Sequence, residues 1–156
     1  MSKEIVIRKA VISDLKVLLT MEQGVISAER PFDPTIKDNP VQYYNIKDLI
    51  TNPKAIVMVA LHNKNVVSCG YGLEKEARPY LSHDTYAYLG FMFTLPNYRG
   101  RGINKLVIDR LKEWAYSQEL YEIRLTVYSD NAAAIQAYVK AGFKSHMITM
   151  RIPREE

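Results

Sequence analysis

The chain has 156 residues, of which 47% are hydrophobic and 24% are charged, and its net charge is +4. This length suits one domain with a core of its own, expected to cover residues 1–156, and the composition excludes a disordered chain and a fibrous repeat. Lysine and arginine are scattered along the sequence, so an anionic ligand is weakly favoured and no nucleic-acid partner is expected.

The first third of the chain predicts one strand and two helices. Residues 5–8 alternate between apolar and polar side chains, as a strand does. Ser13 and Asp14 offer an N-cap to a first helix. Asn39 followed by Pro40 offers the cap and first turn of a second helix. The apolar positions are Leu15, Leu18, Leu19, Val25 and Ile26 in the first helix and Tyr43, Ile46, Leu49 and Ile50 in the second.

The middle of the chain predicts three strands. Residues 55–61 and 66–73 are apolar runs on either side of a turn at residues 62–65, which is the pattern of a β-hairpin. Residues 74–84 are polar and contain a proline, so we expect a loop. Residues 85–94 are rich in aromatic residues and leucine, which favours a strand.

In the last third of the chain the spacing of apolar residues changes from the strand period of two to the helical period, and then back again. Apolar residues from Ile103 to Trp114 line one helix face. Residues 122–128 then predict a strand, residues 132–141 a helix and residues 143–152 a final stretch of strand. Gly142 stands where a left-handed residue commonly ends a helix. This order predicts an α/β sandwich whose mixed sheet has an antiparallel meander early and a βαβ crossover late.

Several features bear on the compartment. Charged residues interrupt residues 1–10, so no signal-peptide core is drawn there. The apolar runs fall far short of the roughly 20 residues that cross a bilayer. The single cysteine, Cys69, cannot form an internal disulfide and is expected to be a small apolar strand residue. We therefore expect a cytoplasmic protein with no membrane partner and no metal.

The most informative segment runs from residue 96 to residue 104, between a strand and a helix. Gly100 and Gly102 let the backbone approach a ligand, and the amides at the start of the helix can hold a pyrophosphate. Arg99 and Arg101 add positive charge. The segment lacks the lysine and hydroxyl ending of a nucleoside-triphosphate loop and the third glycine of a dinucleotide fingerprint. A glycine-rich turn flanked by solvated arginines is the alternative.

The sequence FTLPNYRGRGI at residues 93–103 resembles the acetyl-CoA loop of the GNAT acetyltransferase superfamily. A second stretch, SDNAAAI at residues 129–135, continuing to Tyr138 and to Gly142, resembles the other signature of that superfamily. The likeness extends over essentially the whole chain and is strongest over residues 86–143. It implies a mostly antiparallel mixed sheet, helices on both faces, and two parallel strands that splay apart around the pantetheine arm of acetyl-CoA.

The resemblance also implies roles for particular residues. Tyr138 would protonate the departing CoA thiolate, although a place in the core is the alternative. Asn131 would contact the cofactor arm or act only as a helix cap. Backbone groups would bind the rest of the cofactor: Met92, Phe93 and Thr94 at the pantetheine, and Arg99, Gly100, Arg101, Gly102, Ile103 and Asn104 at the pyrophosphate. Asn97 and Asn104 depart from the residues common in the family, which bears on cofactor affinity.

No general base is evident. Thr126 stands where relatives often have an acid, so a water chain is the preferred base. Glu22, Glu29 and Asp33 could reach the acceptor side. The resemblance places the acceptor pocket between residues 29–38 and the strand side chains Tyr86, Tyr88 and Phe91.

We expect an N-acetyltransferase that moves an acetyl group from acetyl-CoA to a primary amine of a small molecule or peptide. A module that binds acetyl-CoA or CoA without catalysis is the alternative. The acceptor amine stays unidentified, and a homodimer is left open.

Overall fold

The computed structural model describes residues 4–155, and the chain divides into two compact units. The first unit extends to Thr126 and holds the sheet with three of the helices. The second is Val127–Glu156 and holds one helix. Each unit is described by itself.

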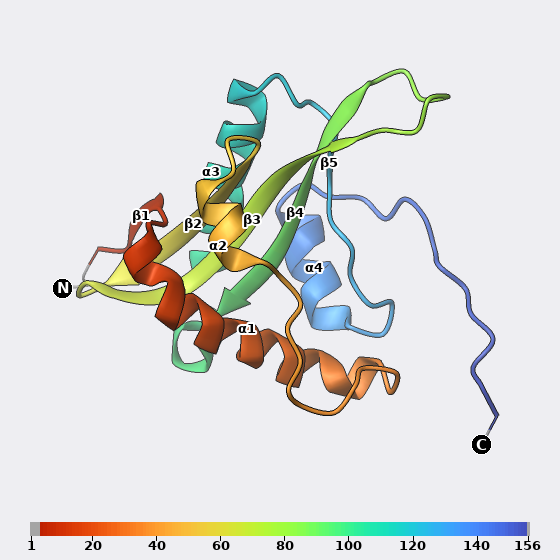
Figure 1. Cartoon of the computed structure of the whole chain (residues 1–156), viewed down its shortest axis with the longest axis horizontal. Coiled ribbons are helices and arrows are strands. Elements are labelled where there is room, and N and C mark those ends of the chain that lie inside the picture. Colours follow the sequence, from red (N-terminus) through yellow and green to blue (C-terminus); the bar gives the residue numbers. More distant parts are fainter. Residues whose placement is uncertain (1–3, 156) are drawn as a thin grey trace. The chain divides into compact units, whose positions relative to one another are not determined.

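The sheet of the first unit has five strands in the order β1-β2-β3-β4-β5. The first four are antiparallel to their neighbours, whereas β5 runs parallel to β4 (Figure 1). This arrangement confirms the predicted fold class, with the meander early and the crossover late. The strands are β1 (Val6–Lys9), β2 (Ala55–His62), β3 (Asn65–Glu76), β4 (Thr85–Thr94) and β5 (Ile123–Arg124).

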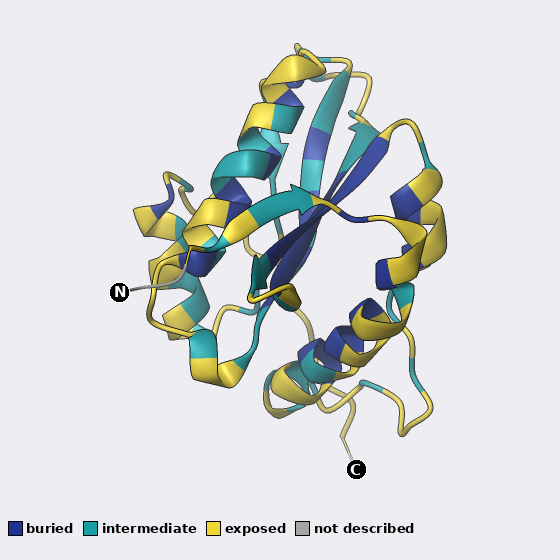
Figure 2. Ribbon diagram, turned by 90° about the vertical axis from the view of Figure 1, so that its left-hand side faces the viewer, coloured by how far each residue is buried: buried dark blue, intermediate teal, exposed yellow. Residues whose placement is uncertain are grey.

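Helices cover both faces of this sheet. Helix α1 (Leu15–Glu29) and helix α2 (Ile46–Thr51) share a core cluster with Cys69, Tyr71 and Phe91. Helix α3 (Ile103–Ser117) packs on the opposite face, behind the sheet in Figure 1. Buried residues follow the central strands and the inner faces of the helices, while the outer helix faces are exposed (Figure 2).

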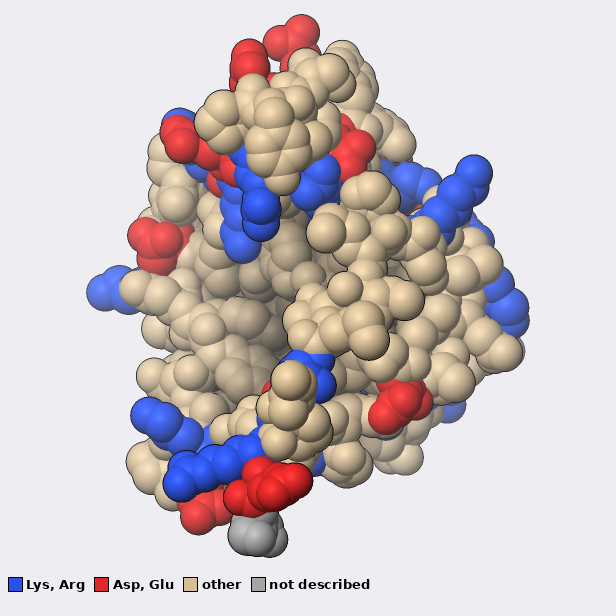
Figure 3. All heavy atoms as spheres, turned by 90° about the vertical axis from the view of Figure 1, so that its right-hand side faces the viewer, with Lys and Arg blue, Asp and Glu red and all other residues tan. Residues whose placement is uncertain are grey.

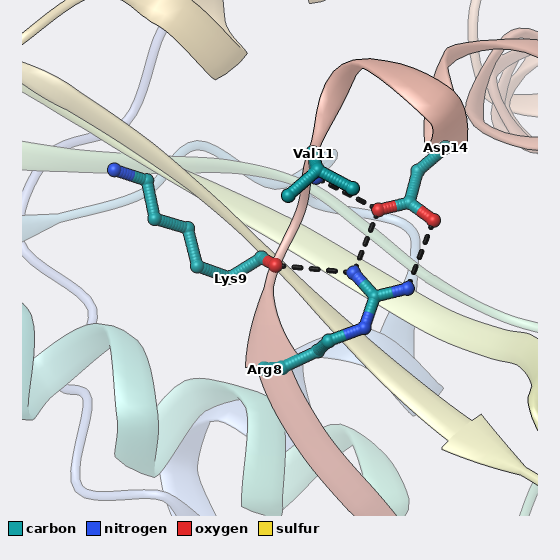
Figure 4. A network of polar contacts seen from close by, with 4 residues as sticks. All are labelled: Arg8, Lys9, Val11 and Asp14. Carbon is teal, nitrogen blue, oxygen red and sulfur yellow. Dashed lines mark hydrogen bonds and ion pairs between the residues drawn. The ribbon is translucent and has the colours of Figure 1, made fainter.

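An ion pair joins β1 to the start of α1 (Figure 4). Arg8 donates to both carboxylate oxygens of Asp14, at 2.7 and 3.0 Å, and the amide of Val11 donates to Asp14 at 2.8 Å. These contacts lower the pKa of Asp14, chiefly through the bond from Arg8. Asp14 is the N-cap residue of α1, as predicted, and follows a 3-10 turn at Ile12–Asp14. Its side chain makes no capping hydrogen bond to α1, because it is engaged by Arg8 and Val11.

The second helix is shorter than the sequence predicts. Helix α2 begins at Ile46, and its cap is Asn45, which accepts from the amide of Asp48 at 3.2 Å. The predicted cap at Asn39 is therefore wrong. Tyr43 precedes the helix because a buried side chain of α1, described below, takes its amide.

The second unit contains helix α4 (Ala132–Lys140), which begins at the predicted residue and ends one residue before the predicted end, with Ala141 as its C-cap. Asn131 caps it by accepting from the amide of Ala134 at 3.3 Å. Gly142 has a φ of 106°, and the amide of Phe143 donates to the carbonyl of Tyr138 at 3.0 Å, which closes the helix. The predicted strand over residues 143–152 is wrong, because the structure shows no strand there.

Residues 4–155 include no helix that is long and apolar enough to cross a membrane. They also include no group of three or more His, Cys, Asp and Glu side chains arranged to hold a metal ion.

Candidate active site

The loop between β4 and α3 has the backbone conformation that its glycines permit. Gly100 and Gly102 both have a φ of 76°, in the left-handed region that other residues rarely adopt. A Cβ atom built on either glycine would meet no atom within 4 Å, so the loop faces open space. Both conditions suit close approach of a ligand to the main chain.

Helix α3 begins at this loop with unpaired amides. Gly102 is its N-cap and supplies no side chain, and the first bond within the helix runs from the amide of Leu106 to the carbonyl of Gly102. The amides of residues 103–105 therefore have no acceptor within the helix. Together with the positive end of the helix dipole they form an anion-binding position.

The two arginines of the loop are exposed but anchored. Arg99 donates from Nε to the carbonyl of Thr94 at 2.9 Å, at the end of β4. The Arg101 guanidinium lies 5.0 Å from the centre of the Tyr98 ring. The Tyr98 hydroxyl is in turn 2.8 Å from Nδ1 of His62. Positive charge is thus held beside the free amides of α3.

Strand β4 separates from β5 before it reaches this loop. The two strands pair only at Ala87 with Ile123 and at Tyr88 with Arg124, while β4 continues to Thr94. In the residues that the structure describes, β5 itself ends at Arg124, which is shorter than the predicted strand over residues 122–128. The edge of β4 from residue 89 to residue 94 is therefore not paired with β5.

A β-bulge lies in this unpaired stretch. The register between β3 and β4 shifts between Cys69 and Tyr71, and Phe91 has a φ of 55°. A positive φ at an aromatic residue costs about 1–3 kcal/mol and is kept only where the surroundings enforce it. Bulges redirect backbone groups and are common beside active sites. Met92, Phe93 and Thr94, the predicted pantetheine-binding residues, follow directly.

Two side chains of β3 hold the carbonyl groups of the bulge. The buried hydroxyl of Ser68 donates to the carbonyl of Phe93 at 2.9 Å, and Sγ of Cys69 donates to the carbonyl of Phe91 at 3.5 Å. Burial raises the pKa of Cys69, which keeps its thiol protonated and able to donate. Cys69 is fully buried, as expected of a small strand residue, whereas the role of Ser68 was not apparent from the sequence.

Four tyrosines gather on the same sheet face as the bulge, and we call them the tyrosine cluster. The Tyr44 ring lies 5.0 Å from the Phe91 ring and 5.5 Å from the Tyr71 ring. Burial raises the pKa of Tyr44 and raises that of Tyr71 to about 12, so both phenols stay neutral. The ring centres of Tyr43 and Tyr44 lie 5.6 Å apart, and those of Tyr71 and Tyr88 lie 6.4 Å apart.

The three acids considered for the acceptor side have different surroundings. Glu22 is fully buried and accepts from the amides of Tyr43 and Tyr44 at 2.9 and 2.8 Å, so it fixes the backbone of the tyrosine cluster. Glu29, at the end of α1, is half-buried, and burial raises the pKa of its carboxyl. Asp33 accepts from the amide of Thr35 at 2.9 Å.

The surroundings of the remaining predicted site residues can be given one by one. Tyr86 is on β4 beneath the guanidinium of Arg124, which is 4.7 Å from its ring centre. Thr126 is exposed, two residues after β5. Asn131 and Tyr138 belong to the second unit, where the Tyr138 ring lies 6.0 Å from that of Phe143, edge to face.

Charges on the face drawn in Figure 3 are dispersed. Lysine and arginine side chains stand in separate groups with aspartate and glutamate among them, and no continuous basic stripe crosses that face.

The chain matches the description "Acetyltransferase (GNAT) family" over residues 23–143. Among curated protein sequences, none matches the chain. Solved structures do resemble it. A mutant of the BH1408 protein from Bacillus halodurans has a TM-score of 0.83 at 19% identity, covering 96% of this chain and 99% of that one.

Two further solved structures are of a predicted acetyltransferase and of an N-acetyltransferase. A predicted acetyltransferase with acetyl-CoA from Clostridium acetobutylicum has a TM-score of 0.73 at 19% identity, covering 96% of each chain. Glucosamine-6-phosphate N-acetyltransferase from Arabidopsis thaliana has a TM-score of 0.70 at 16% identity, covering 98% of this chain and 100% of that one. The TM-scores show that these proteins share the fold of this chain, and at such low sequence identities the likeness concerns the fold alone.

Proposed function

Because the chain belongs to the acetyltransferase (GNAT) family, we propose that it transfers the acetyl group of acetyl-CoA to a primary amine of a small molecule or peptide. The observation that carries the proposal is the loop at Gly100 and Gly102, where free amides, a helix N-terminus and two arginines meet in front of open space. An anionic pyrophosphate fits this donor set.

The unpaired edge of β4 suits the remainder of the cofactor. Pantetheine carries two amide groups, which can pair with backbone groups of Met92, Phe93 and Thr94 in the manner of an added strand. The register shift at Phe91 interrupts the ladder with β3 at this place, and a bulge leaves its extra residue unpaired. The amide of such a residue can donate to the thioester carbonyl as negative charge develops on its oxygen.

The reaction needs two proton movements. The amine nitrogen must be neutral to attack the thioester carbonyl. In the attack the carbon–nitrogen bond forms, and the carbon–sulfur bond then breaks. The amine's proton passes to water, and we assign Tyr138 as the acid that protonates the CoA thiolate, because a phenol is a weak acid and a good donor. Asn131 would hold the cofactor arm from the start of α4.

One observation favours a second candidate function. Thr126 is an exposed hydroxyl where relatives often have a carboxylate, and it cannot act as a base near neutral pH. A module that binds CoA without turnover would have no need of that base. Release of free thiol in the presence of an amine separates the two functions.

Binding of the donor is tested by thermal unfolding. Acetyl-CoA and CoA should both raise the Tm, whereas acetyl-pantetheine, which lacks the pyrophosphate, should raise it far less. Gly102→Asp places a negative charge at the phosphates and should abolish the shift in a folded protein. Gly102→Ala, which has the same strained φ without the charge, is the matched control and should retain part of it. Undiminished CoA affinity in Gly102→Asp would refute this site.

A further inference from the structure

A carboxyl group with no basic partner lies beside the tyrosine cluster. Glu29 is half-buried, and in the part of the chain that is described no lysine or arginine forms an ion pair with it. Its neighbour Arg30 is directed away, donating to the carbonyl of Ile36 at 3.5 Å and to Oδ1 of Asn39 at 3.1 Å. A partly desolvated carboxylate without a cation is unfavourable by itself, so a cationic ligand would be bound strongly there.

The tyrosine cluster connects this carboxyl to the bulge in β4. Tyr43 is near enough to Glu29 to lower the pKa of that carboxyl against the larger effect of burial, and the hydroxyl of Tyr44 lies in the electrostatic field of Glu29. The ring of Tyr44 packs on Phe91, which forms the bulge. Buried Glu22, seven residues before Glu29 on the same helix, anchors the backbone of both tyrosines. Glu29 therefore belongs to the same fixed arrangement as the bulge.

The cluster also accepts a cation on a ring face. Nζ of Lys75 lies 4.1 Å from the centre of the Tyr88 ring, and Tyr88 neighbours Tyr71. Aromatic faces attract ammonium groups by about 0.5–2 kcal/mol, more when water is excluded. Other charged groups near the cluster are Asp33, whose field raises the pKa of Glu29 further, and Lys75 itself. The side toward α1 is thus acidic and aromatic.

We propose that Glu29 and the tyrosine cluster bind an acceptor that carries a second cationic group besides the amine that reacts, as a diamine does. The inference rests on the proposed function. The reacting nitrogen must be neutral when it attacks. A carboxylate that is to stabilise both the bound acceptor and the transition state must therefore bind a second nitrogen, one that stays protonated throughout the reaction. Glu29 is then a specificity-determining residue, and it takes no part in proton transfer.

The test compares a linear diamine with the amino alcohol of the same chain length, which offers the same reacting amine but a hydroxyl in place of the second ammonium. A charge-assisted contact changes binding by about 10- to 100-fold, so kcat/KM should favour the diamine by that ratio. In Glu29→Gln the ratio should fall toward one. Glu29→Asp, which keeps the charge, should retain part of it.

A control and a second readout keep the result interpretable. Glu113→Gln removes the same charge from the exposed surface of α3, where Glu113 pairs with Arg110, and should leave the ratio unchanged. The diamine should also raise the Tm of the CoA complex more than the amino alcohol does, and Glu29→Gln should abolish that difference.

The outcomes separate the two claims. A diamine-specific Tm shift without any turnover would overturn the proposed function and leave this inference standing. Acetylation of both amines with no preference in the unmodified protein, or a preference that persists in Glu29→Gln, would overturn the inference and leave the function standing.

Discussion

Three residues hold backbone conformations on which the candidate site depends. Gly100 and Gly102 adopt a left-handed φ without steric cost, whereas Phe91 adopts one at a cost of about 1–3 kcal/mol. The surroundings maintain it, because the Phe91 ring packs on Tyr44 and its carbonyl accepts from Cys69. The strained residue therefore lies next to the proposed reaction centre, while the unstrained glycines lie at the proposed pyrophosphate site.

Tyr138→Phe tests the proposed acid. The substitution keeps the ring and its contact with Phe143 but removes the proton that the thiolate would receive. We expect kcat to fall about 100-fold or more while the Kd of acetyl-CoA changes little. Tyr116→Phe, on the surface of α3, is the matched control. Unchanged turnover in Tyr138→Phe would make Tyr138 a packing residue.

The pair of Arg8 and Asp14 makes stability depend on pH. The pKa of Asp14 in the folded protein lies below that of an unfolded Asp, which is about 3.9. The stabilisation from the ion pair is therefore fully present above about pH 3.9 and is lost as pH falls through the folded-state pKa of Asp14. Asp14→Asn should lower the free energy of unfolding by about 1–2 kcal/mol at pH 7, toward the low end because Arg8 is 39% exposed. Urea unfolding at pH 7 and pH 3 should show the difference shrinking in acid. A constant difference would contradict this.

At the scale of elements, close approach of α3 to β3 depends on glycine. A Cβ on Gly72 would lie 2.6 Å from a ring atom of Trp114, and one on Gly70 would lie 3.1 Å from Leu111. The helix that begins at the phosphate loop is thereby set close to the strand that supports the bulge. Any change at these glycines should shift α3 as a body.

Gly72→Ala measures that constraint. Replacing a strand glycine by alanine gains roughly 0.4–1 kcal/mol from the unfolded chain, whereas overpacking against a rigid indole costs about 1–3 kcal/mol. The cost of overpacking should exceed the gain from the unfolded chain, so we expect the free energy of unfolding to fall by about 1–2 kcal/mol in urea titrations. A variant more stable than the parent protein would show that Trp114 moves aside freely.

The elements that the sequence predicts correctly are those defined by local pattern. The hairpin of β2 and β3, strand β4, and helices α3 and α4 all have clear periodicity and turn or cap residues. The segment before α2 was predicted wrongly because Glu22, distant in sequence, takes the amides of Tyr43 and Tyr44 away from a helix. Apolar alternation over residues 143–152 predicted a strand, yet Met147, Ile148, Met150 and Ile152 are exposed.

The candidate site likewise contains residues that the sequence predicts and residues that it does not. Gly100 and Gly102 were predictable because glycine adopts a left-handed φ without steric cost. The bulge was not, because phenylalanine gives no signal of a positive φ. Tyr71 could have been found from its place in alternation with Cys69 on one face of β3, whereas Tyr44 was hidden in an expected helix.

At the scale of the whole molecule, family and fold agree. The family match over residues 23–143 and the solved structures, which cover 96% of the chain, both include strand β4 with its bulge, the loop at residues 96–104 and strand β5. The central claim is that this arrangement acetylates an amine at the expense of acetyl-CoA.

The most direct measurement follows free CoA thiol while a panel of diamines and amino alcohols is offered with acetyl-CoA, with the amine product identified by mass spectrometry. We predict amine-dependent thiol release, an N-acetylated product in equal amount, and loss of both in Gly102→Asp. Binding of acetyl-CoA without amine-dependent release across the panel would contradict the account and favour a CoA-binding module.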